Sequence, residues 1–196
     1  GAAARPSRAA STVYVLAVLL SAALLFAVQP MVAKAVLPRL GGAPSTWTTC
    51  LLFFQVVLLA GYCYVHVGAA WLRPMSQALV HVGILAAATF VWPLSLTAYT
   101  EPDLAAPTPW LLSTLVGIVG LPFFAVSATA PLLQRWFASL GHPAAENPYM
   151  LYAASNAGSL LGLLAFPVVL EPWLRLGEQS TLWSAGYVVA GILTAT

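Results

Sequence analysis

Hydrophobic residues of this chain fall into long blocks, separated by short segments that hold most of the charged residues. An α-helix needs about 20 apolar residues to cross the hydrocarbon core of a bilayer. Such blocks lie at residues 12–37, 46–70, 76–97, 109–134, 147–170 and 180–196. We therefore expect an all-α fold, a polytopic transmembrane helix bundle of about six spans. Residues 1–11 would form a cytoplasmic N-terminal segment, and residues 12–196 a single transmembrane helical domain.

The composition agrees with a lipid environment. Of the 196 residues, 61% are hydrophobic and 6% are charged, whereas a soluble domain carries roughly 25% charged residues. The connections between blocks are short and mostly hold Pro or Gly, which predicts an up-and-down bundle without soluble insertions. The net charge of +2 comes without a basic run, so no nucleic-acid surface is expected. The expected partners are the lipid bilayer and other transmembrane helices or subunits.

Charged residues near the block ends suggest an orientation. Arg5 and Arg8 precede the first block as in a signal peptide, but a cleavable signal has an apolar core of only about 7–15 residues. The block 12–37 is longer and should remain as a span. With the N-terminus inside, the cytoplasmic side holds Arg5, Arg8, Arg73 and Arg135, and the outer side holds Lys34, Arg39 and Arg175. The excess of positive charge inside favours a cytoplasmic N-terminus.

One stretch of the first block has an echo later in the chain. LFAVQPMVAKAVLPRLGGAP, residues 25–44, resembles FFAVSATAPLLQRWFASLGHP, residues 123–143. With three helices in each copy, the copies would lie in opposite orientations, which is the inverted-repeat arrangement of many transporters. Apolar spans also resemble one another by chance, so both interpretations stay open.

The first block carries Gln29, Pro30 and Lys34, which are unusual in a lipid-facing helix. Pro30 cannot donate to the carbonyl of Phe26, so a bend is expected there. Gln55 in the next block lies at a similar depth and could bond to Gln29, so that at least one of the two amides satisfies a freed group. In one interpretation these amides join helices while Lys34 reaches the outer headgroups. In the other, Gln29, Lys34 and Gln55 line an outward-facing cavity.

The block at 147–170 places small residues at helical spacing. Gly158 and Gly162 form a small-xxx-small face on which another helix can pack closely, with Asn156 beside it. Asn156 could bond across the helix contact or line a cavity. This face is the most specific packing signal in the sequence.

Chemical signatures of enzymes and metal centres are weak. His66 and His81 flank the turn at Trp71–Pro74 and are weak candidates for binding a metal, but a third ligand is missing. We expect no metal and no cofactor. Phosphate-binding loops and nucleophile elbows do not occur in the sequence. Glu146 and Glu171 stand at block ends, where water is the expected partner.

Three segments carry a family resemblance. They are FAVQPMVAKAVLPRLGGAPSTWTTCLLFFQVVLLAGYCYVH, LPFFAVSATAPLLQRWFA and NPYMLYAASNAGSLLGLLAFPVVLEP. They resemble the membrane-embedded N-terminal region of bacterial spermidine-synthase-like proteins, fusions of a major-facilitator-like membrane part with a synthase domain. The resemblance implies the bacterial inner membrane and a cytosolic aminopropyltransferase-like or methyltransferase-like domain after Thr196. That domain is absent from these residues, so no catalytic residue can be assigned and this chain is not expected to be an enzyme.

Two functional hypotheses follow. The first is an integral membrane domain of a spermidine-synthase-like protein, which anchors a cytosolic domain and could also pass a small solute. The alternative is a non-catalytic structural or accessory transmembrane subunit of a larger bioenergetic or assembly complex. The glycine face of residues 158–162 and the lack of a complete active constellation motivate the alternative.

Overall fold

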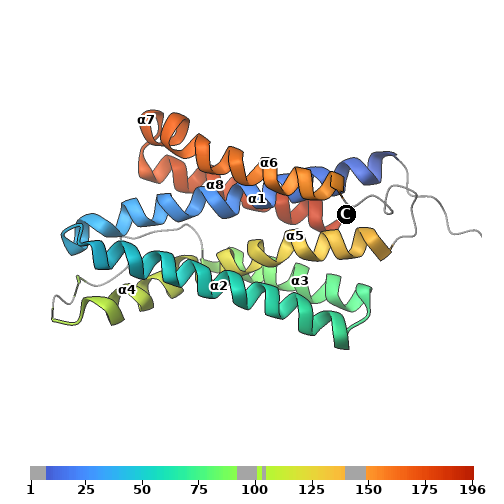
Figure 1. Ribbon diagram of the computed structural model, residues 1–196, viewed down its shortest axis with the longest axis horizontal. Helices are drawn as coiled ribbons and strands as arrows, with labels where there is room; N and C mark the ends of the chain where they lie inside the picture. Colours follow the sequence, from blue (N-terminus) through green and yellow to red (C-terminus); the bar gives the residue numbers. More distant parts are fainter. Residues whose placement is uncertain (1–7, 92–100, 103–104, 140–148) are drawn as a thin grey trace, which may run out of the picture.

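A computed structural model describes residues 8–91, 101–102, 105–139 and 149–196, and every element in these ranges is a helix. The longer helices run side by side along the length of the molecule (Figure 1). In chain order the elements are α1 (Arg8–Val36), η1 (Leu37–Leu40), α2 (Pro44–Trp71), α3 (Pro74–Ala88), η2 (Thr89–Val91), α4 (Pro107–Leu115), η4 (Val116–Gly120), α5 (Leu121–Ser139), α6 (Tyr149–Ala165), η6 (Phe166–Leu170), α7 (Glu171–Trp173) and α8 (Leu176–Ala195). The predicted all-α helical bundle is confirmed.

Five helical segments of the described chain are long and apolar enough to cross a membrane. They are Ala10–Leu40, Pro44–Trp71, Pro74–Val91, Pro107–Ser139 and Tyr149–Trp173, and they match the first five predicted blocks. The sixth block, 180–196, corresponds to α8, which begins earlier, at Leu176, and is not among the five. Residues 1–7, 92–97 and 140–148 of the predicted segments lie outside the described residues.

Proline and glycine define several helix boundaries. Pro44, Pro74 and Pro107 each occupy the first turn of a helix, where the missing N–H breaks no helical bond. Gly41 and Gly42 have φ values of 68° and 67°, a left-handed conformation that glycine adopts without steric cost. This pair turns the chain from η1 toward α2. Helix α1 continues through Pro30 to Val36, because a proline within a bundle can be accommodated by neighbouring helices.

The long helices form two sets of three in chain order, α1, α2 and α3 in the first set and α5, α6 and α8 in the second. Helix α1 contacts α6 and α8 of the second set, and α5 contacts α2 and α3 of the first set. Helices α1 and α5 also contact each other at the centre of the bundle. The first long helix of each set therefore packs on the second and third helices of the other set.

Matching turns precede α3 and α8. Trp71, Leu72 and Arg73 lead into α3 as Trp173, Leu174 and Arg175 lead into α8. Gln77 donates its side-chain amide to the carbonyls of Gly68 and Leu72 at 3.1 and 2.9 Å. Gln179 donates to Leu170 and Leu174 at the same two distances. The shared geometry supports an internal repeat that relates residues 71–77 to residues 173–179. These segments differ from the similar pair at residues 25–44 and 123–143.

Candidate functional site

A polar cavity of about 330 Å³ lies between α1, α2, α5 and α6. Its polar lining consists of Ser21 from α1, Tyr62 from α2, Ser127 and Gln134 from α5, and Tyr152, Ser155, Asn156 and Ser159 from α6. The remaining lining residues are Ala22, Leu25, Phe26, Val126, Ala130 and Pro131. Small-molecule sites usually occupy roughly 300–1,000 Å³, so the volume suits a small ligand.

Ser21 is the most informative residue of this cavity. It lies about 20 Å along α1 from Arg8, which is near the middle of that 29-residue helix. Its side chain is 1% exposed, and its Oγ has no hydrogen-bond partner among the described residues. A buried hydroxyl without a partner costs about 1–3 kcal/mol relative to a satisfied one. A polar ligand or water in the cavity would recover this energy.

Other lining hydroxyls have already used their hydrogens on the backbone. Ser127 Oγ donates to the carbonyl of Phe124 at 2.8 Å, and Ser159 Oγ donates to that of Ser155 at 2.9 Å. These oxygens keep free lone pairs that can accept from a ligand. Gln134 and Asn156 add amides that can both donate and accept.

The lining that the structure describes contains no Asp, Glu, Lys, Arg or His. A charged group at membrane depth is costly unless a partner compensates it. The site is therefore suited to an uncharged polar solute, which neutral hydroxyl and amide groups can bind through hydrogen bonds alone.

A second cavity of about 200 Å³ continues along α1 toward its C-terminal end. It is lined by Phe26, Gln29, Pro30, Ala33, Trp47, Cys50, Leu51, Phe54 and Leu163. Phe26 lines both cavities. Lower-numbered residues of α1 line the polar cavity and higher-numbered residues line the second one, so Phe26 stands at the boundary between them.

The expected Gln29–Gln55 pair is not formed. Gln29 donates its side-chain amide to the carbonyl of Leu25 at 3.2 Å within its own helix, and Gln55 is exposed on the outer face of α2. The acceptor of Gln29 is thus the carbonyl of Leu25 and not that of Phe26, the carbonyl that Pro30 leaves without its helical donor. A side chain bonding back along its own helix needs no second helix. Gln29 lines the second cavity, whereas Gln55 lines neither of these two cavities.

Lys34 forms an ion pair with Glu171, a residue for which the sequence analysis expected water as the partner. Its Nζ lies 2.6 Å from Glu171 Oε2 at the start of α7, and the two side chains are 39% and 40% exposed. Glu171 is thus an ion-pair partner, and the expectation of water alone was wrong. Lys34 lines neither cavity. The other acidic residue of that expectation, Glu146, lies outside the described residues.

The glycine face of α6 lies directly against α1. A Cβ atom at Gly158 would overlap the carbonyl oxygen of Leu19, and one at Gly162 would overlap that of Ala23. Any side chain here would push the helices apart. Asn156 lies on the neighbouring face of α6, where it is exposed and lines the polar cavity.

The two histidines lie in different environments. His66 is exposed on α2, whereas His81 is fully buried. His81 Nε2 bonds to Thr129 Oγ1 of α5 at 3.0 Å, and Thr129 donates its own hydrogen to Ala125. The described residues include no group of three or more His, Cys, Asp or Glu side chains that could hold a metal ion.

Comparison with protein-family models, with curated proteins and with solved structures gives no match. The structure itself adds site residues that the sequence interpretation missed. Ser21, Ser127 and Gln134 lie in apolar blocks and carried no motif, but a hydroxyl in the middle of a predicted span was a usable signal.

Proposed function

We propose that this chain is an integral membrane domain that binds, and passes across the bundle, a small uncharged polar solute. The unpartnered Ser21 hydroxyl carries the proposal, because it is buried at mid-helix and lines the polar cavity. The membrane location agrees with the five helices of the described chain that are long and apolar enough to cross a bilayer.

The chemistry of the lining supports a neutral solute over a polyamine. A polyamine carries several positive charges at neutral pH and would need carboxylates or an equivalent partner at membrane depth. Hydroxyls and amides instead suit a polyol or a small amide, because each polar group of the solute can be paired without moving charge into lipid.

The order of the two cavities supports a path. The polar cavity and the second cavity follow one another along α1, with Phe26 between them. Phe26 would act as the barrier that a solute must pass. In transporters of the inverted-repeat type, the solute site likewise lies near the bilayer midplane at the repeat interface.

As part of the same proposal, the chain is the membrane region of a spermidine-synthase-like protein. The resemblance of the segments at residues 26–66, 121–138 and 147–172 supports this assignment. In that context the bundle would also anchor a cytosolic domain in the bacterial inner membrane, with the N-terminus of the bundle on the cytoplasmic side.

Solute flux into liposomes tests the proposal. Purified protein is reconstituted, and stopped-flow light scattering follows entry of erythritol and ribitol, with spermidine uptake as the charged comparison. We expect polyol flux above that of empty liposomes and no spermidine uptake. Ser21→Val should reduce the polyol flux, because added methyl groups fill the cavity and the hydroxyl is lost.

Ser184→Val is the matched control. Ser184 in α8 is also a buried hydroxyl without a partner among the described residues, but it does not line the polar cavity. Its substitution should leave the flux unchanged. Equal flux from protein-containing and empty liposomes would reject solute passage and leave the structural-subunit alternative, which native mass measurement of bound partners would then address.

A further inference from the structure

Gln77 and Gln179 differ in one respect, although their amide nitrogens make the same pair of bonds. Gln77 Oε1 accepts a hydrogen bond from Trp136 Nε1 of α5 at 3.1 Å. Gln179 Oε1 is buried and has no hydrogen-bond partner in the described part of the chain. Both residues are almost fully buried, at 3% and 1% exposure. Gln179 thus lacks a donor equivalent to the one that Gln77 has in Trp136.

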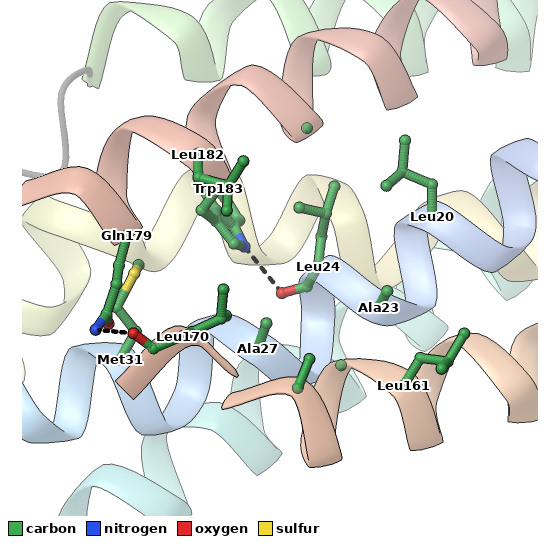
Figure 2. Close-up of a pocket in the computed structure, with 13 residues that line it drawn as sticks. Leu20, Ala23, Leu24, Ala27, Met31, Leu161, Leu170, Gln179, Leu182 and Trp183 are labelled. Carbon is green, nitrogen blue, oxygen red and sulfur yellow. Dashed lines mark hydrogen bonds between the residues drawn. The ribbon is translucent and has the colours of Figure 1, made fainter. Parts of the chain in front are cut away.

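The residues near Gln179 explain why no donor reaches its oxygen. Met31 of α1 lies beside Gln179 (Figure 2), and a thioether has no hydrogen to donate. The indole of Trp183 lines the same cavity, but its Nε1 already donates to the carbonyl of Leu24 at 2.9 Å (Figure 2). Both amide hydrogens of Gln179 are used on Leu170 and Leu174. What remains is one acceptor.

Gln179 lines a cavity of about 260 Å³ between α1, α6 and α8. The other lining residues are apolar or small, and they include Leu20, Ala27, Met31, Leu182, Trp183 and Gly186. Gly186 lies about 10 Å further along α8 than Gln179, so the cavity is long enough for a short stretch of hydrocarbon.

Gln179 lies at the end of the bundle where a polar headgroup would be found. It is in the first turn of α8, next to the exposed residues Arg175 and Glu178. The hydrocarbon part of the cavity lies deeper, toward Leu20 and Leu182. An occupant would therefore place its polar end at the membrane surface and its apolar end among the helices.

We propose that this cavity is a binding site for a hydroxyl-bearing amphiphile of the membrane, whose hydroxyl donates to Gln179 Oε1 while its hydrocarbon lies along α8. The ligand supplies the hydrogen that Trp136 supplies to Gln77 in the other half. The site is separate from the polar solute cavity and does not depend on the proposed transport.

Quenching of Trp183 by brominated probes tests this site. The protein is reconstituted in vesicles containing a dibrominated long-chain alcohol or its methyl ether, which has the same hydrocarbon but no hydrogen to donate. The emission lost in Trp183→Phe identifies the Trp183 signal. We expect the alcohol to quench this signal at a mole fraction roughly 5–10 times lower than the ether, as a net hydrogen bond of about 1–1.4 kcal/mol predicts.

Substitution of the acceptor should remove the preference. Gln179→Met should make alcohol and ether equal, whereas Gln55→Met, which changes an exposed amide on α2, should keep the difference. Equal quenching by the two probes in the unaltered protein would overturn the proposal. The site would then bind hydrocarbon without a preference for a ligand that donates a hydrogen bond.

A second variant covers the case in which Gln179→Met does not fold. Ala27→Leu narrows the cavity from the α1 side and leaves Gln179 in place (Figure 2). It should weaken quenching of Trp183 by both probes severalfold. Unchanged quenching in Ala27→Leu would place the probes outside this cavity and would also overturn the proposal.

Discussion

Lys34 and Glu171 are 137 positions apart in the chain, yet their charged atoms lie 2.6 Å apart at one end of the bundle. The contact joins the C-terminal part of α1 to α7. The lysine is therefore paired at the bundle surface, and its position in an apolar stretch follows from a partner on another helix.

Removal of this ion pair should have a small effect on stability. Glu171→Gln keeps the size of the side chain and removes its charge. Because both groups are about two-fifths exposed, the pair is expected to contribute no more than about 1 kcal/mol, and less at high salt. Unfolding in mixed micelles at two salt concentrations measures this, and a loss well above that range at both would contradict the surface position of the pair.

Substitution of Gly158 should be far more damaging. Gly158→Ala places a methyl group against the Leu19 carbonyl of α1, and separating packed helices costs about 1–3 kcal/mol. Gly191→Ala in α8 is the control, because a Cβ there meets nothing within 4 Å. The control should be neutral or stabilising by up to about 1 kcal/mol through the helix preference of alanine. Similar free energies of unfolding for the two variants would argue against close α1–α6 packing.

The Trp136–Gln77 bond predicts a specific cost. Trp136→Phe removes the indole N–H and leaves Gln77 Oε1 buried without a donor, which should destabilise the protein by about 1–3 kcal/mol. Trp71→Phe is a suitable control, since Trp71 is 84% exposed, and it should change the free energy of unfolding little. If both substitutions have the same effect, the bond does not stabilise the bundle.

Phe26 provides a gain-of-function prediction. Phe26→Ala removes the side chain that lines both cavities along α1 and should join them into a longer one. Under the proposed path, erythritol flux into liposomes should rise severalfold. Leu24→Ala, in the same helix but outside both cavities, should not raise it. A fall or no change for Phe26→Ala in a folded protein would exclude Phe26 as the barrier.

The positions of the helices could be predicted from the sequence, but the contacts between their side chains could not. Block length and composition predicted the segments around α1, α2 and α6 within a few residues, because the bilayer fixes the length of a span. The face of Gly158 and Gly162 could also be recognised from spacing. Depth along a helix placed Gln29 and Gln55 together, but depth does not give rotation about the helix axis, and Gln55 points outward.

The polar cavity and the similarity between the turns before α3 and α8 could be recognised only in the folded structure. Ser21, Ser127 and Asn156 come from three helices, and only their packing brings them together. The segments beginning at Trp71 and Trp173 share Trp-Leu-Arg and a glutamine four positions after the arginine. That pattern is present in the sequence but is too short to indicate a repeat by itself. The matching hydrogen bonds of Gln77 and Gln179 show that the two segments share a local structure.

Accessibility of the polar cavity tests the central claim most directly. In a Cys50→Ala, Cys63→Ala background, Ser155→Cys places a thiol in the cavity lining, and Ser184→Cys places one in the packed interior. A small water-soluble thiol reagent should label Ser155→Cys in liposomes, and erythritol should slow this labelling. The same reagent should not label Ser184→Cys. Labelling of Ser155→Cys no faster than Ser184→Cys, or labelling unaffected by erythritol, would contradict a cavity that binds a polar solute.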